Sequence, residues 1–326
     1  MNLKYEIEVR ADVFNKKLYS FLDDGSPVEL YDAARHLPFA GGKRLRPVLV
    51  MLSCEAVSGS KENALPYAVA LELMHNFTLV HDDIMDKSHL RRNIPTVHIA
   101  YDEATAILAG DLLFAEAFAS LREIKDDYLF RELNNILIEG IIEVCEGQKL
   151  DMDFEKLPII SEEEYMEMIK KKTSALFRIA SEGGALCGRV DEEKRIAFKK
   201  YGENLGLAFQ IHDDYLDMSS SENVLGKDIG NDIRNGKKTL IAVHALNHAT
   251  GMEKERLEKL FGRKDATDEE IREVYNLFRD IGSIRYAEET ANRYSEKAIN
   301  SLDVLESSYS KDILEELARY AIKREK

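Results

Sequence analysis

The chain has 326 residues, of which 45 are Lys or Arg and 60 are Asp or Glu, so its formal net charge is −15. This acidic balance argues against general binding to nucleic acid or to an anionic membrane surface, because both need a basic face. The length allows two domains, or one large helical domain with a substantial core.

Composition favours a single domain. All six prolines precede residue 159, and no internal stretch is rich in Pro, Gly or Ser as a flexible linker would be. We therefore expect one domain over residues 1–326. The start of the chain lacks a signal peptide's apolar region, and no run is expected to be long enough to span a membrane. Cys54, Cys145 and Cys187 lack metal-site spacing, so we expect buried thiols in a reduced, cytoplasmic protein.

Helical periodicity dominates the chain. Apolar residues recur at spacings of three and four, for example in residues 71–78 and 136–144, and β-type alternation is nearly absent. This predicts an all-α bundle of about ten or more helices. Pro47 suits a first helical turn, and Ser161–Glu164 and Thr267–Glu270 have the form of capping boxes. Residues 219–223 and 226–236 are expected to be loops, and residues 251–326 packing helices with a solvated face.

The segment Gly41-Gly42-Lys43-Arg44-Leu45-Arg46-Pro47 places three cations behind two glycines at a predicted helix start. Backbone amides at a helix N-terminus and cationic side chains both favour a phosphate. The segment is therefore a candidate anion site, with a solvated basic turn as the alternative.

Two acidic motifs share one spacing: Asp82-Asp83-Ile84-Met85-Asp86 and Asp213-Asp214-Tyr215-Leu216-Asp217. On a helix, residues four apart lie on one face, so each motif forms a carboxylate cluster. Such a cluster destabilises its helix unless a cation compensates, and carboxylate and phosphate oxygens together suit Mg²⁺. The glycine and distal glutamate of an EF-hand are missing. The motifs predict two Mg²⁺ sites that hold a diphosphate between them.

Cations and polar side chains accompany both motifs. Arg91 and Arg92 follow the first motif, and Lys227 and Lys237 follow the second motif. Lys172-Thr173 lies between the two motifs in the sequence. Each could be ordinary surface charge, but in so acidic a chain they predict phosphate binding. His75, two turns before Asp82, could face a second anion, and Gln210 could offer its amide to a ligand. A structural histidine and an interhelical hydrogen bond are the alternatives for these two.

Taken together, these segments resemble the trans-isoprenyl diphosphate synthases, or polyprenyl synthetases, whose marks are two aspartate-rich motifs and a GGKxxRP element. The resemblance covers about residues 40–240 in the expected order. It implies the isoprenoid synthase fold, in which antiparallel helices surround a central cavity, and a homodimer.

The resemblance also implies a role for each matching residue. The expected metal ligands, for about three Mg²⁺ per site, are Asp82, Asp83, Asp86, Asp213, Asp214 and Asp217. By the resemblance, the allylic diphosphate would be bound by Arg91, Lys172, Lys227 and Lys237. Isopentenyl diphosphate would be bound by Lys43, Arg46, His75 and Arg92. Thr173 and Gln210 would steady a carbocation. The expected catalytic residues are Asp82, Asp83, Asp86, Asp213, Lys172, Thr173 and Gln210. Asp228 follows Lys227 where relatives commonly have proline.

The implied reaction condenses isopentenyl diphosphate with dimethylallyl, geranyl or farnesyl diphosphate: the allylic C–O bond ionises, the isopentenyl double bond attacks the cation, and a proton is lost. Phe77 with Thr78 beside it resembles archaeal-type geranylgeranyl diphosphate synthases, which implies a four-isoprene product. Phe77, Thr78 and Met74 are the expected chain-length residues, although straight-helix geometry places Phe77 roughly opposite Asp82.

Other functions are open at this point. A farnesyl diphosphate synthase or a bifunctional farnesyl/geranylgeranyl synthase would use the same motifs. A class I terpene cyclase would not need a second diphosphate site, and a noncatalytic partner subunit would be expected to have lost aspartates or basic residues. There is no support for a Ser/His/Asp triad, a cysteine nucleophile, a zinc site or a P-loop.

Overall fold

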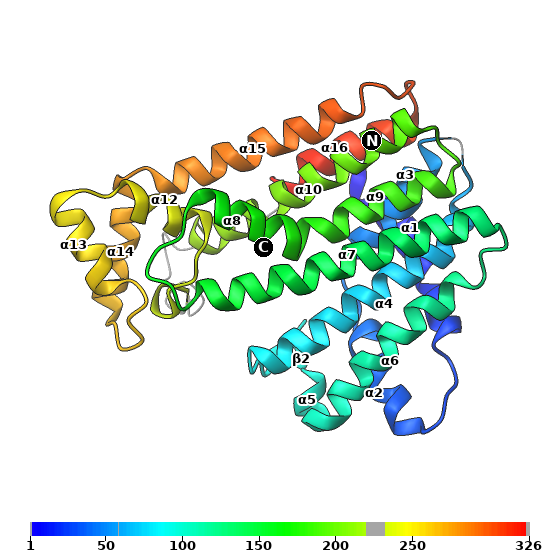
Figure 1. Cartoon of the computed structure of the whole chain (residues 1–326), viewed down its shortest axis with the longest axis horizontal. Coiled ribbons are helices and arrows are strands. Elements are labelled where there is room, and N and C mark those ends of the chain that lie inside the picture. The colour runs from blue at the N-terminus through cyan, green and yellow to red at the C-terminus, as the bar shows by residue number, and fades with distance from the viewer. Residues whose placement is uncertain (1, 58, 220–231, 324–326) are drawn as a thin grey trace. The chain divides into compact units, whose positions relative to one another are not determined.

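The structure, a computed structural model, describes residues 2–57, 59–219 and 232–323. Within these ranges it is almost entirely α-helical, with a single two-stranded hairpin (Figure 1). The predicted all-α class and the predicted number of helices are confirmed. The chain forms two compact units, which we describe separately.

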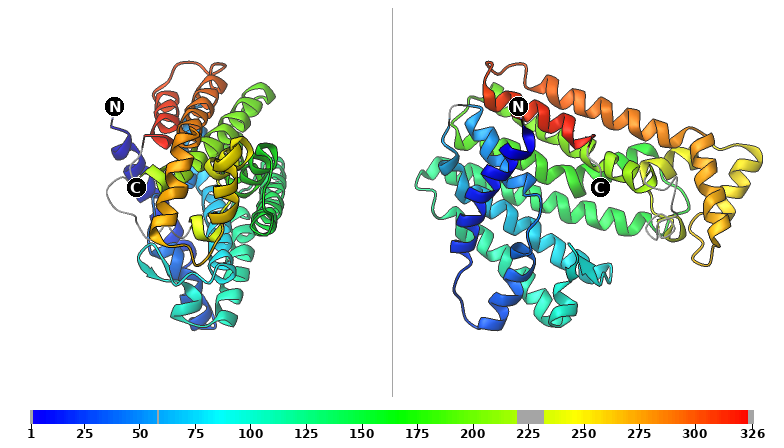
Figure 2. Two further views of the ribbon diagram at one scale, coloured as in Figure 1. Left: turned by 90° about the vertical axis from the view of Figure 1, so that its left-hand side faces the viewer. Right: turned by 180° about the vertical axis from the view of Figure 1, so that it is seen from behind.

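Unit 1 comprises residues up to Ile141 together with Leu176–Lys199 and Leu302–Glu316. Its helices are α1 (Leu3–Phe21), α2 (Val28–Phe39), α3 (Leu45–Glu55), α4 (Lys61–Met85), α5 (Val97–Ala100), α6 (Glu103–Leu121), most of α9 (Ala175–Cys187), and the first parts of α7 (Asp127–Phe154), α10 (Glu192–Ser219) and α16 (Tyr309–Ala321). Helices α3 and α6 both pack along α4, and α4 and α6 run side by side in Figures 1 and 2.

Helix α4 is the central helix of unit 1. From Ala64 to Met74 most of its side chains are buried, including Tyr67, because a helix that is apolar on all sides must be covered all round. The Tyr67 hydroxyl donates to the carbonyl oxygen of Ile179 in α9 at 2.9 Å. Gly183 leaves room for the ring, since a Cβ there would lie 2.1 Å from it. This packing fixes the helix that carries the first aspartate motif.

A hairpin follows α4. Strands β1 (Leu90–Arg91) and β2 (Ile94–Pro95) pair antiparallel, with Leu90 opposite Pro95. The two turn residues, Arg92 and Asn93, have φ of 54° and 62°, and two-residue hairpin turns require this left-handed conformation at both positions. The turn brings two consecutive arginines, Arg91 and Arg92, beside the end of α4, where Arg91 contacts Asp83.

Unit 2 comprises Ile142–Ala175, the described part of 200–301, and the chain from Leu317. Besides the second parts of α7, α10 and α16, it contains α8 (Glu162–Ile169), the π-helix η1 (Lys170–Ser174), α12 (Leu240–His248), α13 (Gly251–Leu260), α14 (Asp268–Asp280) and α15 (Ser283–Ser301). Helix α12 is mostly buried and packs against α14 and α15. Helices α13 and α14 lie side by side in Figures 1 and 2.

Some of the local features predicted from the sequence are present in the structure and others are not. Both predicted capping boxes are present, at Ser161 and Thr267, and Pro47 lies in the first turn of α3. Residues 232–235, predicted to be loop, are helical, while 220–231 lie outside the described residues. Cys54 and Cys187 are buried as expected, but Cys145 is exposed, because it lies on the outer side of α7.

Helix α6 also departs from expectation. By length and composition alone it could cross a membrane, and it is the one such helix in the part of the chain that the structure describes. Its inner side, including Ala109 and Leu113, is buried, but Ile107, Leu108 and Phe114 are exposed. The high hydropathy of α6 therefore arises because both its core-facing side and its exposed side are apolar.

Candidate functional site

Both aspartate motifs lie at the C-terminal end of a helix. Asp82 and Asp83 occupy the last turn of α4, with Asp86 as its C-cap residue, and Asp213–Asp217 lie in the last two turns of α10. The C-terminal end of a helix carries partial negative charge, which disfavours carboxylates there. Each cluster therefore needs nearby positive charge from the protein or a bound cation.

The three aspartates of the first motif differ in environment. Asp83 is 1% exposed, and Arg91 Nε donates to both of its carboxylate oxygens at 2.8 and 2.9 Å. Burial raises the pKa of Asp83, although Arg91 opposes the rise. Asp82 is half-buried and Asp86 is exposed. The outer pair, one turn apart, is thus the solvent-facing pair, while Asp83 faces the protein.

Arg44, in the middle of the GGKRLRP segment, is a buried structural residue. It is 3% exposed and has φ of 49°. Its guanidinium donates to Glu72 at 2.8 Å, to Asn15 Oδ1 at 2.9 Å and to the carbonyl oxygen of Pro38. Of the three cations in this segment, one therefore ties the segment to α4, and Lys43 and Arg46 remain as the candidate ligands for an anion.

The two glycines of this segment make room for Arg92. Gly41 and Gly42 have φ of 92° and 132°, and a Cβ at Gly42 would lie 3.0 Å from Arg92 Cζ. Arg92 Nη1 donates to the carbonyl oxygens of Gly41 and, at 3.2 Å, of Leu37. Burial lowers the pKa of Arg92. The glycines therefore serve both a left-handed turn and a close approach of the guanidinium.

His75 lies within this group of arginines. Its Nε2 is 3.3 Å from Arg46 Nη1, and Arg46 stacks over the Phe177 ring at 4.6 Å from the centroid. Burial, followed by the charges of Arg46 and Arg92, holds the pKa of His75 well below its usual value. The histidine is therefore neutral at neutral pH. We call Lys43, Arg46, His75, Arg91 and Arg92 the basic cluster; the positive charge of its lysine and arginines suits a diphosphate.

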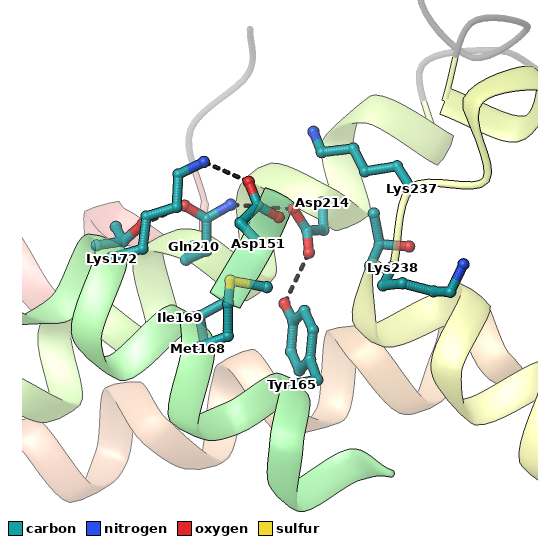
Figure 3. Close-up of a pocket in the computed structure, with 11 residues that line it drawn as sticks. Asp151, Tyr165, Met168, Ile169, Lys172, Gln210, Asp214, Lys237 and Lys238 are labelled. Carbon is teal, nitrogen blue, oxygen red and sulfur yellow. Dashed lines mark hydrogen bonds and ion pairs between the residues drawn. The ribbon is translucent and has the colours of Figure 1, made fainter. Parts of the chain in front are cut away.

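Unit 2 contains a cavity of about 220 Å³ (Figure 3). The predicted residues Lys172, Thr173, Gln210, Asp214 and Lys237 all line it, so the structure brings together side chains that span more than 60 positions. Asp151 and Tyr165, which the sequence analysis did not identify, line it as well. Tyr165 lies seven residues, or two helical turns, before Lys172, which is the one sequence signal that could have indicated it.

Lys172 and Thr173 belong to the π-helix η1. Such segments are uncommon and often occur at functional sites. Two glycines let η1 approach its neighbours: a Cβ at Gly147 of α7 would lie 2.2 Å from Lys172 N, and one at Gly206 of α10 would lie 2.6 Å from Ser174 Cα. The π-helix thus depends on small residues in two other helices.

Two sets of polar contacts lie at the cavity, an ion pair and a chain of hydrogen bonds (Figure 3). Lys172 Nζ pairs with Asp151 Oδ2. Thr173 Oγ1 donates to Gln210 Oε1 at 2.8 Å, Gln210 Nε2 donates to Asp214 Oδ1 at 3.0 Å, and the Tyr165 hydroxyl donates to Asp214 Oδ2 at 2.7 Å. Both oxygens of Asp214 are therefore engaged by protein donors.

Burial and neighbouring charges shift the pKa values of Asp214 and Lys237. Burial raises the pKa of Asp214 to about 6, although Lys237 and its hydrogen bonds oppose the rise. Burial disfavours the charged form of Lys237, but the carboxylates of Asp214 and Asp232 outweigh it and raise the pKa of Lys237. Lys238 extends away from Asp214 in Figure 3 and donates to the Gly236 carbonyl oxygen at 2.9 Å. Lys237 lines the cavity and pairs with Asp232 at 3.9 Å, and Lys227 lies outside the described residues.

The predicted chain-length residues lie in different environments. Met74 is fully buried, and the Thr78 hydroxyl donates to the His75 carbonyl oxygen at 2.8 Å. The half-buried Phe77 ring makes edge contacts with Phe114 of α6, at 5.3 Å between centroids, and with His81 at 4.8 Å. Phe77 thus belongs to an aromatic group on α4 and α6 within unit 1.

The donor chemistry fits Mg²⁺, but the carboxylates alone do not form a complete site. Nowhere in 2–57, 59–219 and 232–323 do three or more His, Cys, Asp or Glu side chains converge as metal ligands. Asp82 with Asp86, and Asp213 with Asp217, each offer two oxygen-donor groups one helical turn apart. Mg²⁺ commonly takes only one or two carboxylates and completes its shell with waters and phosphate oxygens. Such sites suit an ion that arrives with a diphosphate.

Comparison with known proteins gives consistent matches over nearly the whole chain. The polyprenyl synthetase family matches residues 27–278. The geranylgeranyl diphosphate synthase of Methanosarcina mazei is 41% identical over 326 residues, which are 100% of this chain and 99% of the relative. The crystal structure of geranylgeranyl pyrophosphate synthetase from Pyrococcus horikoshii has a TM-score of 0.93 and 42% identity, covering 99% of this chain and 98% of that one. A polyprenyl synthase from Caulobacter crescentus, solved with calcium and isoprenyl diphosphate, has a TM-score of 0.88 and 33% identity, covering 99% and 97%.

Proposed function

Because the chain belongs to the polyprenyl synthetase family and has the all-α isoprenoid synthase fold, we propose that it condenses isopentenyl diphosphate with allylic diphosphates to give geranylgeranyl diphosphate. The main support for this proposal is the cavity of unit 2, which is lined by Lys172, Thr173, Gln210 and Lys237 together with the buried carboxylate of Asp214. The names of the Methanosarcina and Pyrococcus relatives support the four-isoprene product.

In unit 1, we assign isopentenyl diphosphate to Lys43, Arg46, His75 and Arg92 of the basic cluster. His75 is neutral, so it contributes a hydrogen bond rather than charge, and the arginines supply charge-assisted hydrogen bonds to phosphate oxygens. Arg91 is assigned to the allylic diphosphate, and its pairing with Asp83 keeps the guanidinium fixed at the end of α4. Asp82 and Asp86 are the proposed metal ligands of this unit, with Asp83 holding Arg91.

In unit 2, Lys172 and Lys237 are the proposed ligands of the allylic diphosphate. As the allylic C–O bond ionises, negative charge grows on the departing diphosphate, and cations already paired with Asp151 and Asp232 stabilise it without reorganising. Thr173 and Gln210 offer oxygen atoms to the allylic cation. Met168 and Ile169 give the cavity an apolar wall that excludes water, which would otherwise trap the cation as an alcohol.

Mg²⁺ is the proposed cofactor, bound by Asp82 and Asp86 in unit 1 and by Asp213 and Asp217 in unit 2. Bound Mg²⁺ would neutralise diphosphate charge and so improve the leaving group. This family depends on magnesium, and we expect about three ions per site once diphosphate is bound. Chelation of the metal should abolish turnover and leave the fold intact.

We further propose that the protein is a cytoplasmic homodimer and that residues 1–326 act as one polyprenyl synthase domain. The family match runs through parts of both units, which supports one functional domain. The exposed apolar side of α6, with Leu108 55% exposed, supports a partner copy there. Light scattering in solution should give twice the mass of one chain, and a Leu108→Glu variant should shift the protein toward the monomer.

The test is a product assay. Purified protein with Mg²⁺ and isopentenyl diphosphate is supplied with dimethylallyl, geranyl or farnesyl diphosphate, and the released diphosphate and the prenyl chain lengths are measured. A product of four isoprene units from all three primers supports the proposal. Accumulation of farnesyl diphosphate supports the farnesyl synthase alternative, cyclic hydrocarbons support a terpene cyclase, and no condensation with any primer supports a noncatalytic partner subunit.

A further inference from the structure

Tyr165 is a nearly inaccessible side chain whose hydroxyl has hydrogen bonds with Asp214 and with the backbone of Leu240. It is 1% exposed, and its hydroxyl donates at 2.7 Å to Asp214, which is 4% exposed (Figure 3). Burial, followed by the charge of Asp214, raises the pKa of Tyr165 well above its usual value, so the hydroxyl keeps its proton. The second oxygen of the same carboxylate accepts from Gln210 Nε2 at 3.0 Å. The protein has therefore placed a donor on each oxygen of Asp214.

The direction of every hydrogen bond beyond Asp214 follows from this arrangement. An ionised carboxylate only accepts, so the Gln210 amide must turn its nitrogen toward Asp214 and its oxygen away. That oxygen lies 2.8 Å from Thr173 Oγ1, so the single hydroxyl proton of Thr173 points to Gln210. The lone pairs of the Thr173 oxygen are then its only remaining hydrogen-bonding capacity, and Thr173 lines the cavity.

We propose that Tyr165 is a positioning residue: its hydroxyl holds the Asp214 carboxylate against Gln210, and the carboxylate sets one direction for the chain Tyr165–Asp214–Gln210–Thr173, so that Thr173 presents oxygen lone pairs rather than a hydroxyl proton to a cationic reaction centre. Asp214 is in this arrangement an anchor for Gln210 and not a metal ligand. The inference rests on the proposed function, because the cationic centre is the allylic group of that reaction.

The chemistry explains why direction matters. A carbocation is stabilised by oxygen lone pairs and repelled by the positive end of an O–H dipole. If Gln210 rotated its amide, its nitrogen would donate to Thr173, and the threonine proton would turn outward. Gln210 and Thr173 would still be hydrogen-bonded to each other, but the dipole facing the cation would be reversed. A locked anchor at the far end of the chain prevents this reversal.

The first test removes the Tyr165 hydroxyl that holds Asp214 and keeps the aromatic ring, so that the carboxylate is free to turn away from Gln210. In Tyr165→Phe we expect kcat to fall about 10-fold or more, while KM for both substrates and the half-saturating Mg²⁺ concentration change less than about twofold. The matched control is Tyr286→Phe: Tyr286 also donates to a carboxylate in unit 2, Glu162 Oε1 at 2.6 Å, but it does not line the cavity. It should retain kcat. Equal kcat in Tyr165→Phe and wild type, or loss through a higher Mg²⁺ requirement, overturns the proposal.

The second test reverses the chain without removing a group. Asp214→Asn keeps the shape, and Tyr165 continues to donate to the amide oxygen, so the amide nitrogen faces Gln210, which turns its oxygen toward it and its nitrogen toward Thr173. We expect the same loss of kcat as in Tyr165→Phe, with little change in melting temperature, so this variant also decides the question if Tyr165→Phe folds poorly. If Asp214 were a metal ligand, the loss would appear as weaker binding of Mg²⁺ with inorganic diphosphate in calorimetry, as we expect for Asp213→Asn.

Two further measurements separate this proposal from the proposed function. In a Gln210→Ala background the chain is already broken, so adding Tyr165→Phe should cost less than about twofold further; independent, multiplying losses overturn the proposal. A crystal structure of Tyr165→Phe should show the Gln210 amide displaced from Thr173, and an unchanged Gln210 and Thr173 overturns it whatever the activity. An inactive wild-type protein, by contrast, contradicts the proposed function itself.

Discussion

Replacement of Arg44 tests whether the GGKRLRP segment contains one structural cation and two ligand-binding ones. The Arg44 and Glu72 side chains are 1% and 4% exposed, and Arg44 Nη1 lies 2.8 Å from Glu72 Oε1. In Arg44→Met, the Glu72 carboxylate is left buried without its counter-charge. Lys43→Met is the matched control, because Lys43 lies next to Arg44 in the same segment but is exposed.

The expected effect is large. Removal of one partner from a buried ion pair costs about 3–5 kcal/mol. At about 2 °C per kcal/mol for a chain of this size, the melting temperature of Arg44→Met should fall by about 6–10 °C. An exposed substitution such as Lys43→Met changes stability by less than about 0.5 kcal/mol, but it should raise KM for isopentenyl diphosphate.

Thermal unfolding followed by circular dichroism measures this difference. The double variant Arg44→Met with Glu72→Leu should recover most of the lost stability, because replacing both partners with apolar groups removes the uncompensated charge. A melting temperature for Arg44→Met within about 2 °C of wild type would refute the structural role. Failure of the double variant to recover would show that the stability lies in the contacts with Asn15 and Pro38 instead.

Three further outcomes are expected. Phe77→Ala should lengthen the product, because the resemblance assigns Phe77 to chain length and loss of its ring, which contacts Phe114 of α6, would leave room for a longer apolar chain; an unchanged chain-length profile by chromatography contradicts this role. Asp82→Ala should lower kcat by about 100-fold or more and weaken isopentenyl diphosphate binding far less, and equal losses would contradict the separate roles. Below pH 6.5 the unfolded chain protonates His75 while the native protein keeps it neutral, so this residue reduces stability as pH falls, by up to about 1.4 kcal/mol per pH unit. His75→Asn should remove that part of the slope, and equal slopes in denaturant titrations would refute the shifted pKa.

The sequence by itself determined the helical class and most of the chemistry. Helical periodicity and local signals such as the Ser161 and Thr267 capping boxes act over a few residues, so they can be recognised without the tertiary structure. The DDxxD spacing is likewise local, because residues four apart share a helix face. Lys172, Thr173, Gln210 and Lys237 were selected from their charge or polarity beside the motifs, the resemblance assigned their roles, and the structure places all four around one cavity.

Only the tertiary structure decided which side chain of each charged group is buried and paired inside the protein. Arg44 lies between Lys43 and Arg46 in a string of similar cations, and its burial depends on Glu72, 28 positions away. Likewise, Asp83 and Asp214 are the middle aspartates of their motifs, and their partners Arg91 and Tyr165 come from other elements. Tyr165 and Asp151 carry no motif, and the π-helix of Lys172 forms where Gly147 and Gly206 permit close approach. Such roles follow from burial and from contacts between distant residues, which local spacing does not encode.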